Sequence, residues 1–148
     1  MSMAKTRKKL NFKPHDNPKP DGKIVAHSAP TSGSTDDVCP IFSLEHVEGD
    51  YCLSKCTTEE KASFADTLHK LGRQTWGVLK VRGRHKGGFE KIARHALGDR
   101  KYPPEVTDEV NMVAFRFCAM KPMVGYRVGR VFVILFLDRD FTLYDHGG

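Results

Sequence analysis

Three apolar segments near the end of the chain follow one another so closely that they constrain the fold more than any other feature. They span residues 111–118, 123–128 and 130–137. In the first segment Val113, Phe115 and Phe117 alternate with other residues, which is the period of a strand with one buried face. The third is apolar without interruption from Val131 to Leu137, which is typical of a central strand covered on both faces. Because the connections are short, we expect a three-stranded antiparallel meander.

A long helix is predicted upstream of these strands. Thr57 and Glu60 have the spacing of a capping box, and apolar residues recur at helical spacing after them. The pattern predicts a helix over residues 58–80, and the helix-weakening glycines Gly72 and Gly77 allow a break near either of them.

The remaining segments complete an α+β order. Apolar residues at i, i+3, i+4 and i+7 predict a second, shorter helix over residues 89–98, which Gly98 can end. A first short strand is expected near Ile41 to Val47, and a last one from Phe141 to Tyr144. We therefore expect a small antiparallel sheet with two helices packed on it.

The first 37 residues differ in composition from the rest of the chain. They contain scattered prolines, lysines and a run of small polar residues without apolar periodicity, which predicts a disordered basic tail over residues 1–37. We expect residues 38–148 to form the domain. The chain as a whole is 39% hydrophobic and 28% charged, which is the composition of a globular protein.

No apolar stretch reaches the roughly 20 residues of a membrane span, and the basic start is not followed by the apolar core of a signal peptide. We therefore expect a cytoplasmic protein without a membrane partner. Four cysteines are too few for a disulfide scaffold in a chain of 148 residues, so reduced thiols are expected.

Positive charge is concentrated in residues 80–101. This segment contains eight Lys and Arg residues and two acidic residues, which gives it a net charge of +6. Such a segment favours a phosphate-backbone partner, although acidic proteins and a merely solvated face are alternatives. The candidate nucleic-acid-binding residues are Arg82, Arg84, Lys86, Lys91, Arg94 and Lys121.

Three arginines and a tyrosine lie at the ends of the predicted strands. If Arg116, Arg127, Arg139 and Tyr144 converge on one concave surface, they can hold a phosphodiester. The alternative is that each arginine is solvated or paired with a neighbouring carboxylate.

RNA cleavage by 2′-OH attack needs a base for that proton, cations for the phosphorane and an acid for the leaving oxygen. Arginine supplies the cations, so neither a metal nor another cofactor is required. For the base, His85 in the glycine-rich basic loop of residues 82–88 is the best placed histidine, because neighbouring Arg84 and Lys86 favour its neutral form, and His146 is the second choice. An exposed histidine without a role is the alternative for both.

The C-terminal part of the chain, residues 113–145, resembles the RelE/ParE toxin superfamily of bacterial toxin–antitoxin pairs. The resemblance rests on the string from Ala114 to Cys118, the step Gly125-Tyr126-Arg127, the apolar strand, and Arg139 followed by Tyr144. It implies a RelE-like fold and a ribosome-associated endoribonuclease that cleaves mRNA without a metal and is neutralised by an antitoxin protein.

The resemblance also implies roles for individual residues. Arg116 and Arg127 would bind phosphate or stabilise charge, Arg139 would stabilise or protonate the leaving group, and Tyr144 would orient the nucleotide or transfer a proton. The chain departs from the family pattern at Cys118, where a second lysine is usual, so Lys121 or Lys86 would have to replace it. The chain is also longer than the family pattern at the tail and at the glycine-rich loop, which leaves open a non-catalytic, ParE-like protein that binds nucleic acid or inhibits gyrase.

A zinc-binding adaptor is a third hypothesis. Cys39, His46, Cys52 and Cys56 offer metal-ligating side chains, but the three-residue spacing between Cys52 and Cys56 is not the usual two-residue knuckle. Reduced, partly buried thiols are the simpler interpretation.

Overall fold

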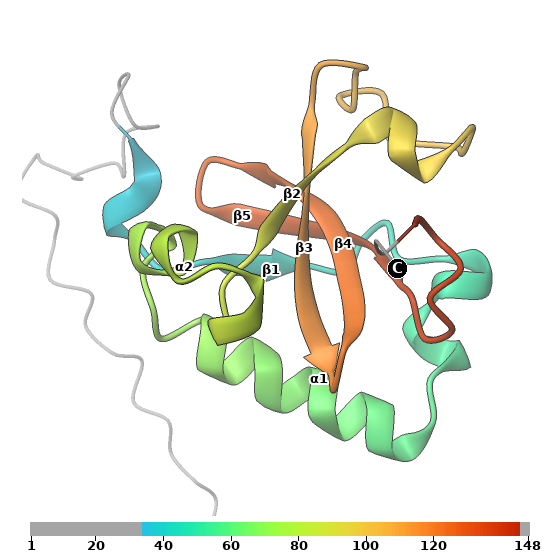
Figure 1. Ribbon diagram of the computed structural model, residues 1–148, viewed down its shortest axis with the longest axis horizontal. Coiled ribbons are helices and arrows are strands. Elements are labelled where there is room, and N and C mark those ends of the chain that lie inside the picture. The colour runs from blue at the N-terminus through green and yellow to red at the C-terminus, as the bar shows by residue number, and fades with distance from the viewer. Residues whose placement is uncertain (1–33, 146–148) are drawn as a thin grey trace, which may run out of the picture. The chain divides into compact units, whose positions relative to one another are not determined.

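The computed structural model describes residues 34–145, except for the side chain of Arg84. Within this part of the chain two α-helices and five strands form the α+β fold that the sequence predicts (Figure 1). The strands are β1 Ile41–Ser43, β2 Glu90–Ala93, β3 Asn111–Cys118, β4 Lys121–Val128 and β5 Val131–Leu137, and the helices are α1 Thr58–Leu71 and α2 Trp76–Arg82. Most of the predicted tail, residues 1–33, and also His146 lie outside the described residues.

The five strands form one mixed sheet in the order β1-β5-β4-β3-β2. The predicted meander is confirmed, because β3, β4 and β5 pair antiparallel in sequence order. The prediction of a wholly antiparallel sheet is wrong at one edge, where β1 runs parallel to β5. The long segment between these two strands gives β1 the length of chain that a parallel connection needs.

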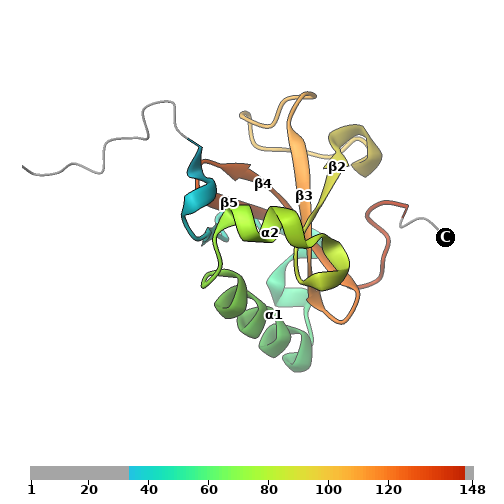
Figure 2. The same ribbon diagram turned by 60° about the vertical axis from the view of Figure 1, so that its left-hand side comes forward.

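Apolar side chains fill both faces of the sheet. One cluster lies between the sheet and the helices and includes Trp76, Phe115 and Phe132; Figure 2 shows both helices on this side. The second cluster, on the opposite face, includes Met112 and Leu135 and is covered by loop residues instead of α-helices. β5 contributes to both clusters, as its uninterrupted apolar run predicts, although β4 and not β5 occupies the middle of the sheet.

The predicted long helix breaks at Gly72. The capping box is present, since Thr57 Oγ1 accepts from the Glu60 backbone N–H at 3.2 Å and Glu60 Oε1 accepts from the Thr57 backbone N–H at 2.8 Å. α1 ends at Leu71, and α2 begins behind a second N-cap, in which Thr75 Oγ1 accepts from a backbone N–H at 3.3 Å.

The helix predicted over residues 89–98 is wrong. Residues Glu90–Ala93 form β2, which pairs antiparallel with β3, and Arg94–Leu97 form a short 3₁₀ helix (η5) that Gly98 ends with φ +74°. The free edge of β3 satisfies the backbone of this segment and overrides its apolar spacing, because short apolar runs do not distinguish a helix from a strand.

The strand predicted from Phe141 to Tyr144 is also absent from the described residues. Asp138, which is fully buried, instead accepts hydrogen bonds from the backbone N–H groups of Thr142 and Leu143 at 2.9 and 3.0 Å. Aspartate commonly stabilises turns by binding backbone N–H groups in this way. The turn directs the chain back over the sheet as far as Tyr144.

Candidate functional site

The basic loop between α2 and β2 is closed by its own backbone. The Gly88 N–H donates to the Gly83 carbonyl at 2.8 Å, and the three residues Arg84–Lys86 between them form a single 3₁₀ turn. A Cβ atom at Gly88 would lie 2.5 Å from the Leu79 carbonyl oxygen, so only glycine permits this closure. The loop therefore holds His85 at a defined place beside the end of α2.

His85 lines a cavity of about 400 Å³, here called the basic pocket. Its walls come from the end of α1, the end of α2, the closed loop and the β3–β4 hairpin. The lining residues are Thr67, Lys70, Leu71, Gln74, Arg82, His85, Gly87, Gly88, Phe115, Arg116, Ala119 and Met120. Lys70, Arg82 and Arg116 bring three permanent positive charges, and among the described residues no Asp or Glu belongs to the lining. Such an arrangement attracts an anion, and phosphate is the anion that arginine binds best through its fork of donors.

Arg116 connects the basic pocket with Tyr144. Its Nη2 donates to Glu90 Oε1 at 3.1 Å, its Nη1 donates to the Met120 carbonyl at 3.1 Å, and the Tyr144 hydroxyl donates to the same Glu90 oxygen at 3.0 Å. The β2–β3 register accounts for the contact, because Glu90 pairs with Ala114, two residues from Arg116 on the same face of the sheet.

Burial, followed by the charge of Glu90, raises the pKa of Tyr144 to about 12. Tyr144 therefore remains a proton donor at neutral pH. The predicted proximity of Arg116 and Tyr144 is confirmed, with a carboxylate between them that the sequence did not indicate.

Arg127 lies elsewhere, and its predicted convergence with Arg116 is wrong. Pro122 of β4 pairs with Arg116, so Arg127 is five residues farther along the strand, about 16 Å at roughly 3.3 Å per residue. Arg127 also lies on the helix-covered face, where its guanidinium is 4.4 Å from the centre of the Trp76 ring.

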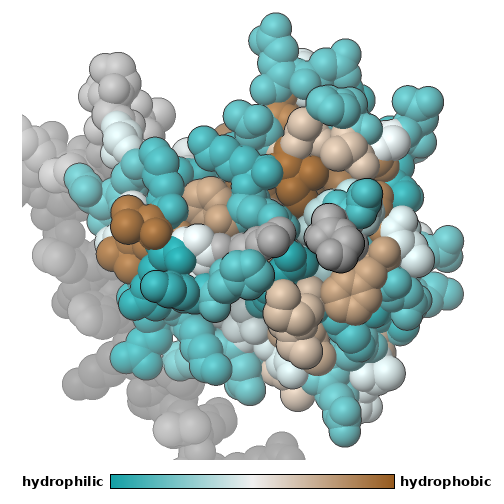
Figure 3. Space-filling view, viewed as in Figure 1, coloured by the Kyte–Doolittle hydropathy of each residue, from teal (hydrophilic) through white to brown (hydrophobic). Residues whose placement is uncertain are grey.

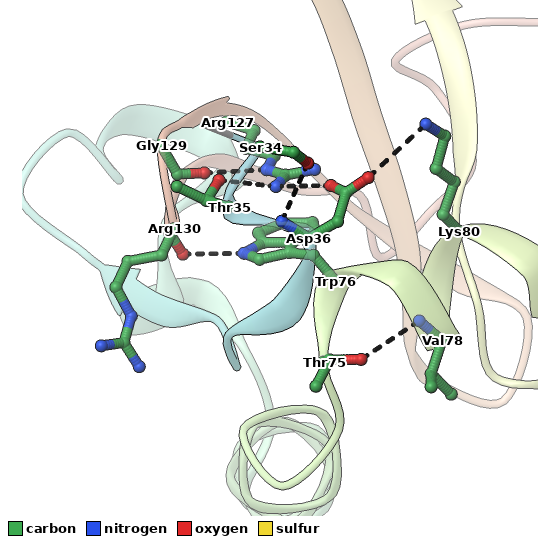
Figure 4. Close-up of polar contacts among 10 residues, drawn as sticks. All are labelled: Ser34, Thr35, Asp36, Thr75, Trp76, Val78, Lys80, Arg127, Gly129 and Arg130. Atoms are coloured by element: carbon green, nitrogen blue, oxygen red, sulfur yellow. Dashed lines mark hydrogen bonds and ion pairs between the residues drawn. The ribbon is translucent and has the colours of Figure 1, made fainter. Parts of the chain in front are cut away.

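Figure 4 shows Arg127 surrounded by the residues at the start of the described chain. Its guanidinium donates to Thr35 Oγ1 at 2.7 Å, to Asp36 Oδ1 at 2.9 Å and to the Gly129 carbonyl at 2.8 Å. The hydrogen bond from Arg127 holds the pKa of Asp36 below its ordinary value. Arg127 thus anchors the 3₁₀ helix Thr35–Asp37 (η1), so these last residues of the predicted tail are ordered against the domain.

Arg139 also lies outside the basic pocket. It lines a separate cavity of about 330 Å³ together with Asp50, Lys55 and Asp140. The surroundings of this arginine are therefore mixed in charge, unlike those of Arg116.

The predicted nucleic-acid-binding residues divide into three groups. Arg82 lines the basic pocket. Lys86 and Lys91 are exposed and are not among its lining residues. Arg94 and Lys121 have structural partners, because Arg94 pairs with Asp108 and Lys121 donates to the buried Glu60 at 2.9 Å, which raises the pKa of Lys121. Arg84 belongs to the closed loop by its backbone.

Sequence reasoning missed three residues of the site: Lys70, Gln74 and Glu90. Lys70 is in the last turn of α1 and Gln74 lies three residues beyond its end, and the packing of α1 against β3 brings both to the pocket wall. Glu90 was assigned to a helix. Residues Glu90–Ala93 do not alternate apolar and polar side chains, so periodicity gives no signal that could have found this strand.

The cysteines do not form the zinc site of the third hypothesis. Among the described residues, no group of three or more His, Cys, Asp or Glu side chains is placed to hold a metal ion. Cys56 is buried in the helix-side core, and the Cys52 thiol donates to the Val47 carbonyl at 3.4 Å. All four cysteines are free thiols.

The outer surface is mainly hydrophilic on the face shown in Figure 3, with small separate apolar areas. Within residues 34–145, neither helix combines the length and apolar character required to cross a lipid bilayer. A scan of family models and searches of curated proteins and of solved structures found no match to this chain. The resemblance to RelE/ParE toxins therefore stays a prediction.

Proposed function

We propose that this protein is an endoribonuclease that binds single-stranded RNA in the basic pocket and cleaves it without a metal ion. The observation that supports the proposal is the gathering of Lys70, Arg82, Arg116 and His85 around one cavity that no acidic residue of the described part of the chain lines. Glu90 and Tyr144, joined to Arg116 by hydrogen bonds, supply groups that can exchange protons beside these cations.

The chemistry follows from the needs of transesterification. The Glu90 carboxylate accepts the proton of the 2′-hydroxyl, whose oxygen forms a bond to phosphorus. Arg116, Arg82 and Lys70 stabilise the dianionic phosphorane. His85, expected from the sequence to be the base, acts here as the acid and gives a proton to the 5′-oxygen as the bond from phosphorus to that oxygen breaks. The products are a 2′,3′-cyclic phosphate and a 5′-hydroxyl, and exchange with water restores both side chains.

The resemblance to RelE-type toxins extends the proposal to the biological setting. It suggests mRNA on the ribosome as the substrate and an antitoxin protein as the regulatory partner. In this scheme Arg116 and Tyr144 keep the roles that the resemblance implies, whereas His85 takes the place of Arg139 as the acid.

A second candidate is a ParE-like protein that binds nucleic acid or inhibits gyrase without cleaving RNA. The observation that favours it is that Arg116 already binds Glu90 and the Met120 carbonyl, while Arg127 and Arg139 lie outside the pocket. An arginine neutralised in this way binds an anion more weakly than a solvated one.

The two candidates are separated by incubating the full chain in EDTA with an unstructured RNA, with translating ribosomes and with gyrase. New 2′,3′-cyclic phosphate ends support the nuclease, and inhibited gyrase with intact RNA supports the second candidate. Intact RNA in both RNA assays overturns the nuclease proposal.

The site is tested with Arg82→Ala, which removes an exposed pocket cation, and with Lys61→Ala as its control. Lys61 is an exposed cation of α1 that does not line the pocket. We expect RNA cleavage to fall at least tenfold in Arg82→Ala only. Equal activity in both variants would place the reaction elsewhere.

A further inference from the structure

The basic pocket has two kinds of wall. Cationic side chains form one part, and Leu71, Phe115 and the half-exposed Met120 form the other. The cavity of about 400 Å³ is near the lower end of the range for small-ligand sites, which begins at roughly 300 Å³. The pocket thus has room for one nucleotide, with its phosphate on the cations and its base on the apolar wall, but not for a duplex.

Gln74 lines this pocket, and hydrogen bonds connect it to the end of α1. Its Nε2 donates to the Lys70 carbonyl at 3.2 Å, and its backbone N–H donates to the Leu71 carbonyl at 3.1 Å. Both contacts belong to the turn that ends α1, so the side chain is held by the helix end.

The other half of the amide is left without a partner. Gln74 Oε1 is shielded from water and accepts no hydrogen bond within the described part of the chain. A buried acceptor without a donor is costly, so an exception of this kind in a folded protein calls for an explanation, such as a role in catalysis or a bound water or ion that supplies the donor. The remainder of the side chain is partly exposed in the pocket wall. The terminal torsion of glutamine is also soft, so the oxygen can turn toward a donor in the cavity while the backbone stays in place.

We infer that Gln74 is the base-reading residue of the pocket and that its Oε1 accepts a hydrogen bond from the exocyclic amino group of the bound base. The inference rests on the proposed function for the identity of the ligand as RNA. Adenine, cytosine and guanine carry an amino group at their edge, whereas uracil offers only an N–H flanked by two carbonyl oxygens that repel another oxygen. The pocket therefore disfavours uracil.

The test measures equilibrium binding of mononucleotides, so it does not depend on cleavage. AMP, CMP and GMP are each compared with the monophosphate that lacks the amino group: purine riboside monophosphate, zebularine monophosphate and inosine monophosphate. In the unmodified protein we expect the nucleotide that binds best to lose about tenfold in affinity when its amino group is deleted, the value of one hydrogen bond. In Gln74→Leu that difference should vanish, while it persists in Arg73→Ala, a change at the exposed neighbouring residue.

The outcomes separate this inference from the proposed function. Nucleotides that bind without any amino-group effect, or an effect that survives in Gln74→Leu, overturn the inference and leave RNA cleavage to its own assay. Failure of every nucleotide to bind at millimolar concentration also overturns it. If the amino-group effect is present but RNA is not cleaved, the nuclease proposal is overturned and the role of Gln74 in recognising the base is kept.

Discussion

Arg116 and Tyr144 donate hydrogen bonds to a single atom, Oε1 of Glu90, at 3.1 and 3.0 Å. One residue comes from β3 and the other from the turn after β5, so the carboxylate joins two segments that the sheet alone does not connect. The proposed reaction depends on this carboxylate, and its properties lead to the first two predictions.

Glu90→Gln should lower RNA cleavage by at least about 100-fold, because an amide cannot accept the 2′-hydroxyl proton, and general-base catalysis typically contributes 10²- to 10⁴-fold. The amide keeps an oxygen for Arg116 and Tyr144, so the fold should persist. Single-turnover cleavage, with circular dichroism to verify folding, measures the effect. Glu109→Gln, at an exposed carboxylate, is the control. Full activity in Glu90→Gln would exclude Glu90 as the base.

Tyr144 should make the free energy of unfolding depend on pH in alkaline solution. Its pKa is raised from 10.0 to about 12, so the folded protein keeps a proton that the unfolded chain has released. This contribution to stability is complete below about pH 10 and is lost as the pH rises toward 12. Urea denaturation from pH 8 to pH 11 should therefore show a steeper decline for the unmodified protein than for Tyr144→Phe. Equal slopes would mean that Tyr144 ionises near its ordinary pKa.

Arg127→Ala should destabilise the fold by about 2 kcal/mol, since it removes a partly buried ion pair and a cation–π contact with Trp76. The folded fraction should still cleave RNA, because Arg127 lies on the other face from Arg116. Urea denaturation and cleavage at a temperature well below the transition measure the two effects. A variant with unchanged stability and no cleavage would instead support the phosphate-binding role that the resemblance implies.

Gly125→Ala should cost at least about 3 kcal/mol, because the added Cβ would lie 2.0 Å from the Val133 carbonyl oxygen, where neither backbone can yield. The register of β4 and β5 shifts at this glycine. Gly49→Ala is a suitable control, because nothing lies within 4 Å of its added Cβ. Only the positive φ of +69° disfavours alanine there, so we expect a loss of about 1 kcal/mol in the free energy of unfolding. Comparable losses in the two variants would show that contact with Val133 is not the cause.

The sequence predicted individual helices and strands more accurately than it predicted which of them pair or pack together. The capping box and the meander depend on local spacing, and the structure confirms both. The sequence allowed a helix break near Gly72 or Gly77, and the structure has it at Gly72. The helix predicted over residues 89–98 failed because the free edge of β3, distant in sequence, recruits β2.

The candidate site followed the same division. Arg116 and Tyr144 were correctly expected to lie together. Arg127 was misplaced because strand register determines the face and the distance of each side chain, and a one-residue change of register reverses the face. Gln74 and Lys70 became part of the site only through the packing of α1 against β3, which no short-range pattern reveals.

The parallel pairing of β1 with β5 also has a consequence for synthesis of the chain. Ile41 pairs with Val131, so this edge of the sheet can close only after the chain as far as β5 has emerged from the ribosome. The basic pocket, in contrast, takes its walls from residues 67–120. Contacts across short sequence separations form faster than distant ones. We therefore expect the walls of the pocket to assemble in the nascent chain before β1 pairs with β5.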